Sequence, residues 1–206
     1  MPLWARPALA VALLVLGGCL TAHPRVPDRS GRPAAAFAPD DFFDGWTRGL
    51  GVLSVRLRSP ELLCVVGRGR AQPDGTFRLD QTVTYPDGRT TGRTWTLGRA
   101  SPTVWTGTLT DADGTVTAEA TGDELAIRYR MGSPGVTMRQ RLVLQPDGRT
   151  ALNLSTVRVL GVPVARLVEH IQKTDGPVRC GDAAPPGGAP PGGAEPGGAI
   201  PGGAAE

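Results

Sequence analysis

Residues 124–144, ELAIRYRMGSPGVTMRQRLVL, contain two short runs in which apolar and polar side chains alternate. The runs, 124–131 and 136–144, place apolar side chains on one face and arginines on the other. The apolar members are Leu125, Ile127, Tyr129, Met131, Val136, Met138, Leu142 and Leu144. A period of two is typical of antiparallel strands with one buried and one solvent-exposed face. The stretch therefore predicts two strands of an all-β protein.

The same alternation continues on both sides and is interrupted by Asp-Gly pairs at 74–75, 87–88, 113–114 and 147–148. Asp-Gly between alternating runs favours a tight hairpin turn. We expect nine or ten strands, at 49–57, 62–70, 76–85, 90–98, 103–110, 115–121, 124–131, 136–145, 150–159 and 163–173. Short turns indicate an antiparallel up-and-down meander, and closure as a small barrel would remove both edge strands. A two-sheet sandwich is the alternative.

Two segments of this unit are less regular. Residues 40–47 (DDFFDGWT) predict a short helix or plug, in which Phe42, Phe43 and Trp46 would be buried at one barrel end. Residues 163–173 fit a helical spacing about as well as a strand spacing. We therefore expect a strand there and keep a helix as the alternative.

Residues 1–18 (MPLWARPALAVALLVLGG) have the charge and apolar stretch of a signal peptide. Leu16-Gly17-Gly18-Cys19 resembles a bacterial lipobox, in which the Cys19 thiol receives a diacylglyceryl group. Acyl chains contribute roughly 0.8 kcal/mol per buried CH₂, so this residue would anchor the chain to a membrane. We expect a lipid-anchored protein of the cell envelope that faces the periplasm. Leu20 after the cysteine favours the outer over the inner membrane.

The remaining chain divides by composition. Residues 19–39 are rich in Pro, Ala and Arg and predict a lipidated tether, and 40–181 form the β-barrel domain. Residues 182–206 contain four repeats of the form PGGA and predict a disordered tail, because Pro and Gly supply no core. The central unit of about 140 residues is long enough for one well-formed core.

Several function classes are disfavoured by composition and motifs. The net charge of +3 is too weak for a nucleic-acid binder with a broad basic face. Two His and three Cys argue against a metal site, and the chain has no Gly-x-Ser-x-Gly nucleophile motif. We therefore expect no enzyme activity, no metal and no cofactor, and a monomeric protein.

Cys64 and Cys180 remain after Cys19 is assigned to the lipid. Outside the cytoplasm such a pair usually forms a disulfide. In a closed barrel the first and last strands are neighbours, so the bridge is geometrically reasonable. Two free thiols, with Cys64 buried as a small apolar residue, are the alternative.

Candidate ligand-binding residues lie on the face predicted to point inward. They are Arg93, Trp95, Trp105, Tyr85 and Tyr129, with Gln81 on the same interior. An arginine inside an apolar barrel must be paired or stacked. It could stack on Trp95 or pair with a carboxylate, or it could bind the acid group of an amphipathic ligand. On the outer face, Arg128, Arg130, Arg139 and Arg141 would form a positive stripe if their two strands pair.

Four stretches, FFDG at 42–45, YPDGRTTGRTWTL at 85–97, WTGTLTDADGTVTAEATGDELAIRY at 105–129 and the segment from Asn153 to Lys173, resemble domain-of-unknown-function family 3833. The resemblance covers about 40–175. It implies a short bacterial protein, often a lipoprotein, with a small lipocalin-like barrel at the membrane surface. It implies no reaction, because the family has no assigned activity.

These observations lead to two hypotheses. In the first, the chain is a membrane-anchored lipoprotein whose barrel binds a small apolar or amphipathic ligand. In the second, the barrel is solidly packed, and an accessory envelope protein uses its outer surface to bind a protein or lipid partner. Barrel size separates them, because about eight strands enclose only packed side chains or one small ligand.

Overall fold

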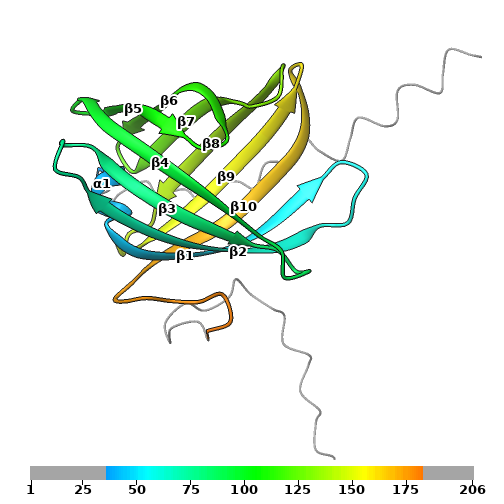
Figure 1. Ribbon diagram of the computed structural model, residues 1–206, viewed down its shortest axis with the longest axis horizontal. Helices are drawn as coiled ribbons and strands as arrows, with labels where there is room; N and C mark the ends of the chain where they lie inside the picture. Colours follow the sequence, from blue (N-terminus) through cyan, green and yellow to red (C-terminus); the bar gives the residue numbers. More distant parts are fainter. Residues whose placement is uncertain (1–35, 183–206) are drawn as a thin grey trace, which may run out of the picture.

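The computed structural model describes residues 36–182 (Figure 1). The signal segment 1–18, Cys19 and its lipobox, the tether up to residue 35, and the tail from 183 lie outside the described residues. The elements are α1 (Pro39–Phe42), β1 (Gly45–Val55), β2 (Glu61–Ala71), β3 (Phe77–Thr84), β4 (Thr90–Ser101), β5 (Val104–Leu109), β6 (Ala112–Thr121), β7 (Glu124–Met131), β8 (Val136–Leu144), β9 (Thr150–Val159) and β10 (Val162–Thr174).

The ten strands form one closed antiparallel barrel, in the order β1-β10-β9-β8-β7-β6-β5-β4-β3-β2 (Figure 1). Sequence neighbours pair throughout, and β1 pairs with β10 from Trp46 opposite Thr174 to Val55 opposite Ala165. The expected closed meander is confirmed, and the sandwich alternative is wrong because this last ladder leaves no gap between two sheets. The segment 163–173 is a strand and not a helix, since its backbone pairs with β1 and β9.

The three Pro-Asp-Gly sequences form the turns after β2, β3 and β8. In each, the glycine has a positive φ and the aspartate Oδ1 accepts the backbone N–H two residues on, as Asp74 does from Thr76 at 2.9 Å. Asp113-Gly114 behaves differently. It lies inside β6, where the register with β7 shifts between Asp113 and Thr117. The hairpin expected at this pair is therefore replaced by a bulge, which a glycine with φ of 83° accommodates.

Inward side chains form a large core at the α1 end and a smaller one at the other end. The large core contains most of the aromatic residues, including Trp95 and Trp105 at 5% and 2% exposure. The smaller core contains Leu63, Val65 and Val83, with Tyr85 packed against it. Both ends of the barrel wall are thus lined by apolar side chains.

The plug expected at 40–47 begins earlier in the chain. Phe37, Phe42 and Phe43 are buried, and the Phe37 N–H donates to the carbonyl of Gly122 at 2.8 Å. Phe37 therefore belongs to the barrel core and not to the tether. Trp46 is not part of the plug. It lies only partly buried in β1, beneath the Arg68 guanidinium at 5.1 Å.

Two contacts fix the plug against the barrel. Lys173, at the end of β10, donates from Nζ to the carbonyls of Asp41 and Asp44 at 2.7 and 3.0 Å, and so satisfies carbonyls where α1 ends. Gly69 on β2 has its α-carbon against Phe43, and a side chain there would overlap the Phe43 carbonyl. The glycine thus marks a close approach of two backbones.

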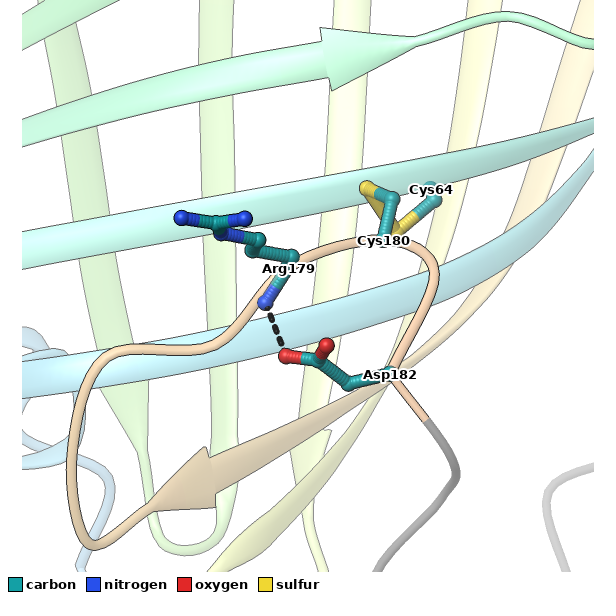
Figure 2. The surroundings of a disulfide bond; sticks show 4 residues. All are labelled: Cys64, Arg179, Cys180 and Asp182. Atoms are coloured by element: carbon teal, nitrogen blue, oxygen red, sulfur yellow. Dashed lines mark hydrogen bonds between the residues drawn. A yellow bond between two sulfur atoms is a disulfide. The ribbon is translucent and has the colours of Figure 1, made fainter.

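After β10 the chain turns back along the outside of the barrel and is joined to β2 by a disulfide between Cys64 and Cys180 (Figure 2). Cys64 alternates with the buried Leu63 and Val65, so it faces outward. Next to the bridge, the backbone N–H of Arg179 donates a hydrogen bond to Asp182 Oδ2 at 2.6 Å, which forms a tight turn around Cys180 (Figure 2). The disulfide holds the C-terminal segment on the barrel surface.

We predict that replacing both Cys64 and Cys180 by alanine lowers the free energy of unfolding by about 2–4 kcal/mol, because the bridge closes a long loop in the unfolded chain. The two cysteines are 116 residues apart. Denaturant titration of the oxidised, reduced and doubly substituted proteins measures the effect. The reduced protein should match the double variant, and equal stability of all three would contradict the prediction.

Candidate functional site

A cavity of about 30 Å³ lies in the lumen between the plug and the middle of the barrel. Most of its wall is apolar, with Phe43, Leu125 and Ile171 among its members. Five polar side chains also reach it, from opposite sides of the barrel: Gln81, Arg93, Gln140, Asn153 and Glu169. An apolar cavity with a few convergent polar groups is the usual composition of a small-molecule site.

Glu169 on β10 forms the centre of one polar wall. It is 3% exposed, and its Oε2 accepts a hydrogen bond from Asn153 Nδ2 at 2.9 Å. Asn153 Oδ1 in turn accepts from the Ser155 hydroxyl at 2.9 Å. Asn153 lies directly opposite Glu169 in the β9–β10 ladder, which fixes the two side chains on the same inner face. Gln140 on β8 extends this wall, since it lies opposite Ser155.

Two glycines of β1 make room for the carboxyl group. Gly49 and Gly51 face inward, and a β-carbon on either would meet the Glu169 side chain. Burial raises the pKa of Glu169, while the Asn153 hydrogen bond and the Arg93 charge oppose the shift. The lumen therefore favours the protonated carboxyl more than water does, and in that form the group can donate a hydrogen bond as well as accept one.

The opposite wall is formed by Arg93 on β4 and Gln81 on β3, which lie directly opposite each other in the ladder. Gln81 Oε1 accepts hydrogen bonds from Arg93 Nε at 3.1 Å and from Trp95 Nε1 at 2.8 Å. The guanidinium lies 6.0 Å from the centroid of the Trp95 ring. One glutamine thus orients a cation and an indole toward the same cavity.

The two walls are linked by an aromatic contact that lies beside the cavity. Trp95 and Tyr129 on β7 meet edge to face, with ring centroids 5.7 Å apart. Burial raises the pKa of Tyr129 to about 12, so its hydroxyl remains a neutral hydrogen-bonding group at physiological pH. The Gln140 Nε2 lies 3.5 Å from that hydroxyl oxygen.

The five ligand-binding residues expected from the sequence separate into two groups. Arg93 and Trp95 line the cavity. Trp105 is buried in the large core, with Arg99 over its ring. Tyr129 packs against Trp95 on the side away from the cavity. Tyr85 packs against the small core, with Arg89 over its ring. These three therefore support the wall and do not line the cavity. Alternation placed all five on one face, but only the closed barrel decides which positions meet the cavity.

Sequence reasoning missed the Glu169 wall. The available signal was a carboxylate on the otherwise apolar face of 163–171, and the spacing placed Glu169 with the inward Leu167 and Ile171. His170, its neighbour, faces outward and is exposed. The pairing of Glu169 with Asn153 depends on the β9–β10 register, which a single sequence does not contain.

Within residues 36–182, no cluster of His, Cys, Asp and Glu is arranged to hold a metal ion. Over the same part of the chain, no helix has the length and apolarity that a membrane span requires.

The closed antiparallel barrel, with α1 at one end of its lumen, has a lipocalin-like fold. The model of the family "Protein of unknown function (DUF3833)" matches residues 13–173, and the chain belongs to this family. A comparison with curated proteins finds no match.

Solved structures with the same architecture share little sequence with the chain. The S-type phycobiliprotein lyase CPES from Guillardia theta is 7% identical, with a TM-score of 0.53 over 67% of this chain and 92% of that chain. Rv2717c from M. tuberculosis is 15% identical, with a TM-score of 0.51 over 66% and 98%. A protein of unknown function from the DUF3598 family of Nostoc punctiforme is 16% identical, with a TM-score of 0.51 over 69% and 50%. These similarities establish a shared fold.

We predict that Glu169→Gln raises the free energy of unfolding above neutral pH and changes it little near pH 4. The folded-state pKa of Glu169 lies above its unfolded value of about 4.3. Stability is therefore greatest below the unfolded pKa and decreases as pH rises toward the folded pKa. The glutamine keeps an oxygen for Asn153 and removes the titration.

Urea titrations across this pH range measure the effect, with Glu119→Gln as the control because Glu119 is exposed on β6. Parallel pH profiles for the natural protein and Glu169→Gln would contradict the prediction.

Proposed function

We propose that this protein is a non-catalytic, membrane-anchored binding protein that holds a small amphipathic ligand in its barrel. The ligand would place its polar group between Arg93 and Glu169 and its apolar part against the aromatic plug. The likeness in fold to the phycobiliprotein lyase CPES is consistent with a barrel that accommodates a small ligand.

The single observation that carries the proposal is a cavity with an arginine on one wall and a buried carboxyl group on the facing wall. Arg93 supplies a cation and Gln81 orients it, while Glu169 supplies a carboxyl group whose raised pKa favours its neutral form. With Glu169 protonated, the cavity carries a positive charge and a hydrogen-bond donor, which together favour an anionic head group. Side chains of this kind cost stability in a barrel that is merely packed.

The size of the cavity sets how binding occurs. A volume of about 30 Å³ holds roughly two water molecules. A ligand larger than this would therefore have to shift the neighbouring wall. Pro39 and Phe43 of the plug region line the cavity, so this segment is where the site would expand.

The anchoring part of the proposal rests on the sequence. Leu16-Gly17-Gly18-Cys19 has the order of an apolar residue, two small residues and the cysteine that receives the lipid. Only 17 residues separate Cys19 from Phe37, which is the first buried residue in the described range 36–182. The barrel would therefore lie close to a membrane of the cell envelope, on its periplasmic side.

A packed accessory protein that acts through its outer surface is the second candidate. The small volume of the lumen cavity favours it, because a barrel without a ligand needs no more space than this. The two candidates differ in whether any molecule enters the lumen.

We predict that the purified protein binds a fluorescent medium-chain fatty acid more tightly than its methyl ester, and that Arg93→Gln removes the difference. A hydrogen bond to a charged group contributes about 1.5–3 kcal/mol. Arg93→Gln should therefore lower the affinity for the acid about tenfold or more and change the affinity for the ester little. Fluorescence titration of both probes measures this.

Arg89→Gln is the matched control, because Arg89 lies over Tyr85 outside the cavity. Native mass spectrometry of protein purified from its own host adds an independent readout, in which a bound mass leaves on denaturation. A clean apo mass together with no uptake of either probe would overturn the lumen proposal and favour the packed barrel.

We predict that Cys19→Ser releases the protein from membranes in its own host, because the serine hydroxyl cannot receive the diacylglyceryl group. Fractionation followed by immunoblotting measures the distribution. Cys64→Ser is the control, since Cys64 lies on β2 in the disulfide. Retention of Cys19→Ser in the membrane fraction would contradict the lipid anchor.

A further inference from the structure

The outer face of β7 to β10 carries a row of arginines at one level of the sheet. Arg128 lies directly opposite Arg139, Arg139 is opposite Thr156, and Thr156 is opposite Arg166. Adjacent strands are about 4.8 Å apart. The register therefore places the two arginine side chains next to each other on the same face of the sheet. Like charges directly opposite each other destabilise a sheet. The Arg128–Arg139 pair therefore contributes nothing favourable to the fold by itself, and a function of this face would account for it.

A surface hollow of about 330 Å³ lies over this row. One carboxylate, Glu124, lines it, and it forms an ion pair with Arg141 at 2.7 Å. The arginines that line it are Arg128, Arg139, Arg141, Arg158 and Arg166. The residues between 36 and 182 that line the hollow carry five cationic side chains and one anionic one, a formal charge of +4, whereas the whole chain has a formal charge of +3. The charges are thus unevenly distributed, and this face is strongly basic although the net charge of the protein is small.

An apolar row runs beside the arginines. Leu62 on β2 lies opposite Val52 on β1, which lies opposite Val168 on β10, and Val168 lies opposite Leu154 on β9. Leu62, Val52 and Val168 are 71%, 40% and 37% exposed. Leu154 and Val168 also line the basic hollow, so the apolar and basic surfaces are continuous.

We infer that this outer face, made of the arginine row and the adjoining apolar row, docks the barrel on an anionic phospholipid bilayer. The arginines would bind lipid phosphates, and the leucine and valine side chains would enter the region between head groups. Charge complementarity favours a bilayer as the partner, because an anionic membrane surface offers many phosphates to several arginines at once. The apolar row favours it too, because the bilayer has an apolar layer directly beneath its phosphates. The inference goes beyond the lumen and holds with or without a ligand there.

The test uses the chain from Leu20 to Glu206, with its disulfide formed and without the lipid-bearing cysteine. It should bind vesicles of phosphatidylcholine with about 30% phosphatidylglycerol, and not vesicles of phosphatidylcholine alone. Binding at about 0.1 M salt should be lost at about 0.5 M, where screening is stronger. In co-sedimentation, Arg128→Gln with Arg139→Gln should lower partitioning roughly ten- to thirtyfold, because each basic residue near the surface contributes about fivefold.

The matched control is Arg78→Gln with Arg89→Gln. It removes the same charge from β3 and the turn after it, and β3 lies five strands from β8 in either direction around the barrel. This control should change partitioning less than twofold, and Arg128→Lys with Arg139→Lys should retain most of the binding. The thermal midpoint of the Arg128/Arg139 glutamine variant should not fall, because a like-charge contact is removed.

Three outcomes would overturn the inference. They are no binding to the anionic vesicles, equal loss in the test and control variants, and equal binding to both kinds of vesicle. None depends on the lumen ligand, so failure here leaves the fatty-acid titration unaffected.

Discussion

The pairing of β1 with β10 is the constraint on which the rest of the structure depends. It satisfies the backbone groups of both terminal strands and turns a meander into a closed wall. It also creates the interior, since Gly51 on β1 lies opposite Glu169 on β10 and the glycines leave the space that the carboxyl occupies. Without that ladder, Glu169 would be a carboxylate at a sheet edge. With it, the carboxyl is enclosed and faces a cation across the lumen.

The lumen combines two kinds of packing. Toward the plug, aromatic rings and aliphatic side chains fill the barrel, and Lys173 and Gly69 hold the plug in place. Around the cavity, hydrogen-bonded polar groups replace part of that packing. Buried polar groups are favourable only when their partners are fixed, and both walls meet this requirement through cross-strand pairs. The buried Glu169 still carries a cost, because burial disfavours its charged form, and this cost is the physical reason to connect the cavity with binding.

The inner and outer faces of the same strands carry different chemistry because strand side chains alternate. On β8, Gln140 points into the lumen, while Arg139 and Arg141 on either side of it point to solvent. The same strands can therefore form a wall of the cavity and a basic outer surface. On the neighbouring part of the barrel, the disulfide holds the C-terminal segment against β2. If the proposed lipid at Cys19 and the proposed docking face both act, they would together restrict how the barrel lies on a membrane.

The sequence by itself determined the strands, most of the turns and which side chains share a face, because these follow from a period of two and from the conformational freedom of Asp-Gly. It predicted the lumen positions of Arg93 and Trp95 for the same reason, and the alternation placed the arginines of β7 and β8 on the outside. It did not determine that Phe37 belongs to the core, that Asp113-Gly114 forms a bulge, or that Trp46 faces outward. Only the tertiary structure decided that Glu169 pairs with Asn153 and that Arg93 lies on the wall facing them. It also decided that the arginine row and the apolar row are continuous. These depend on strand register and barrel closure, which join residues distant in the chain through contacts that no local pattern records.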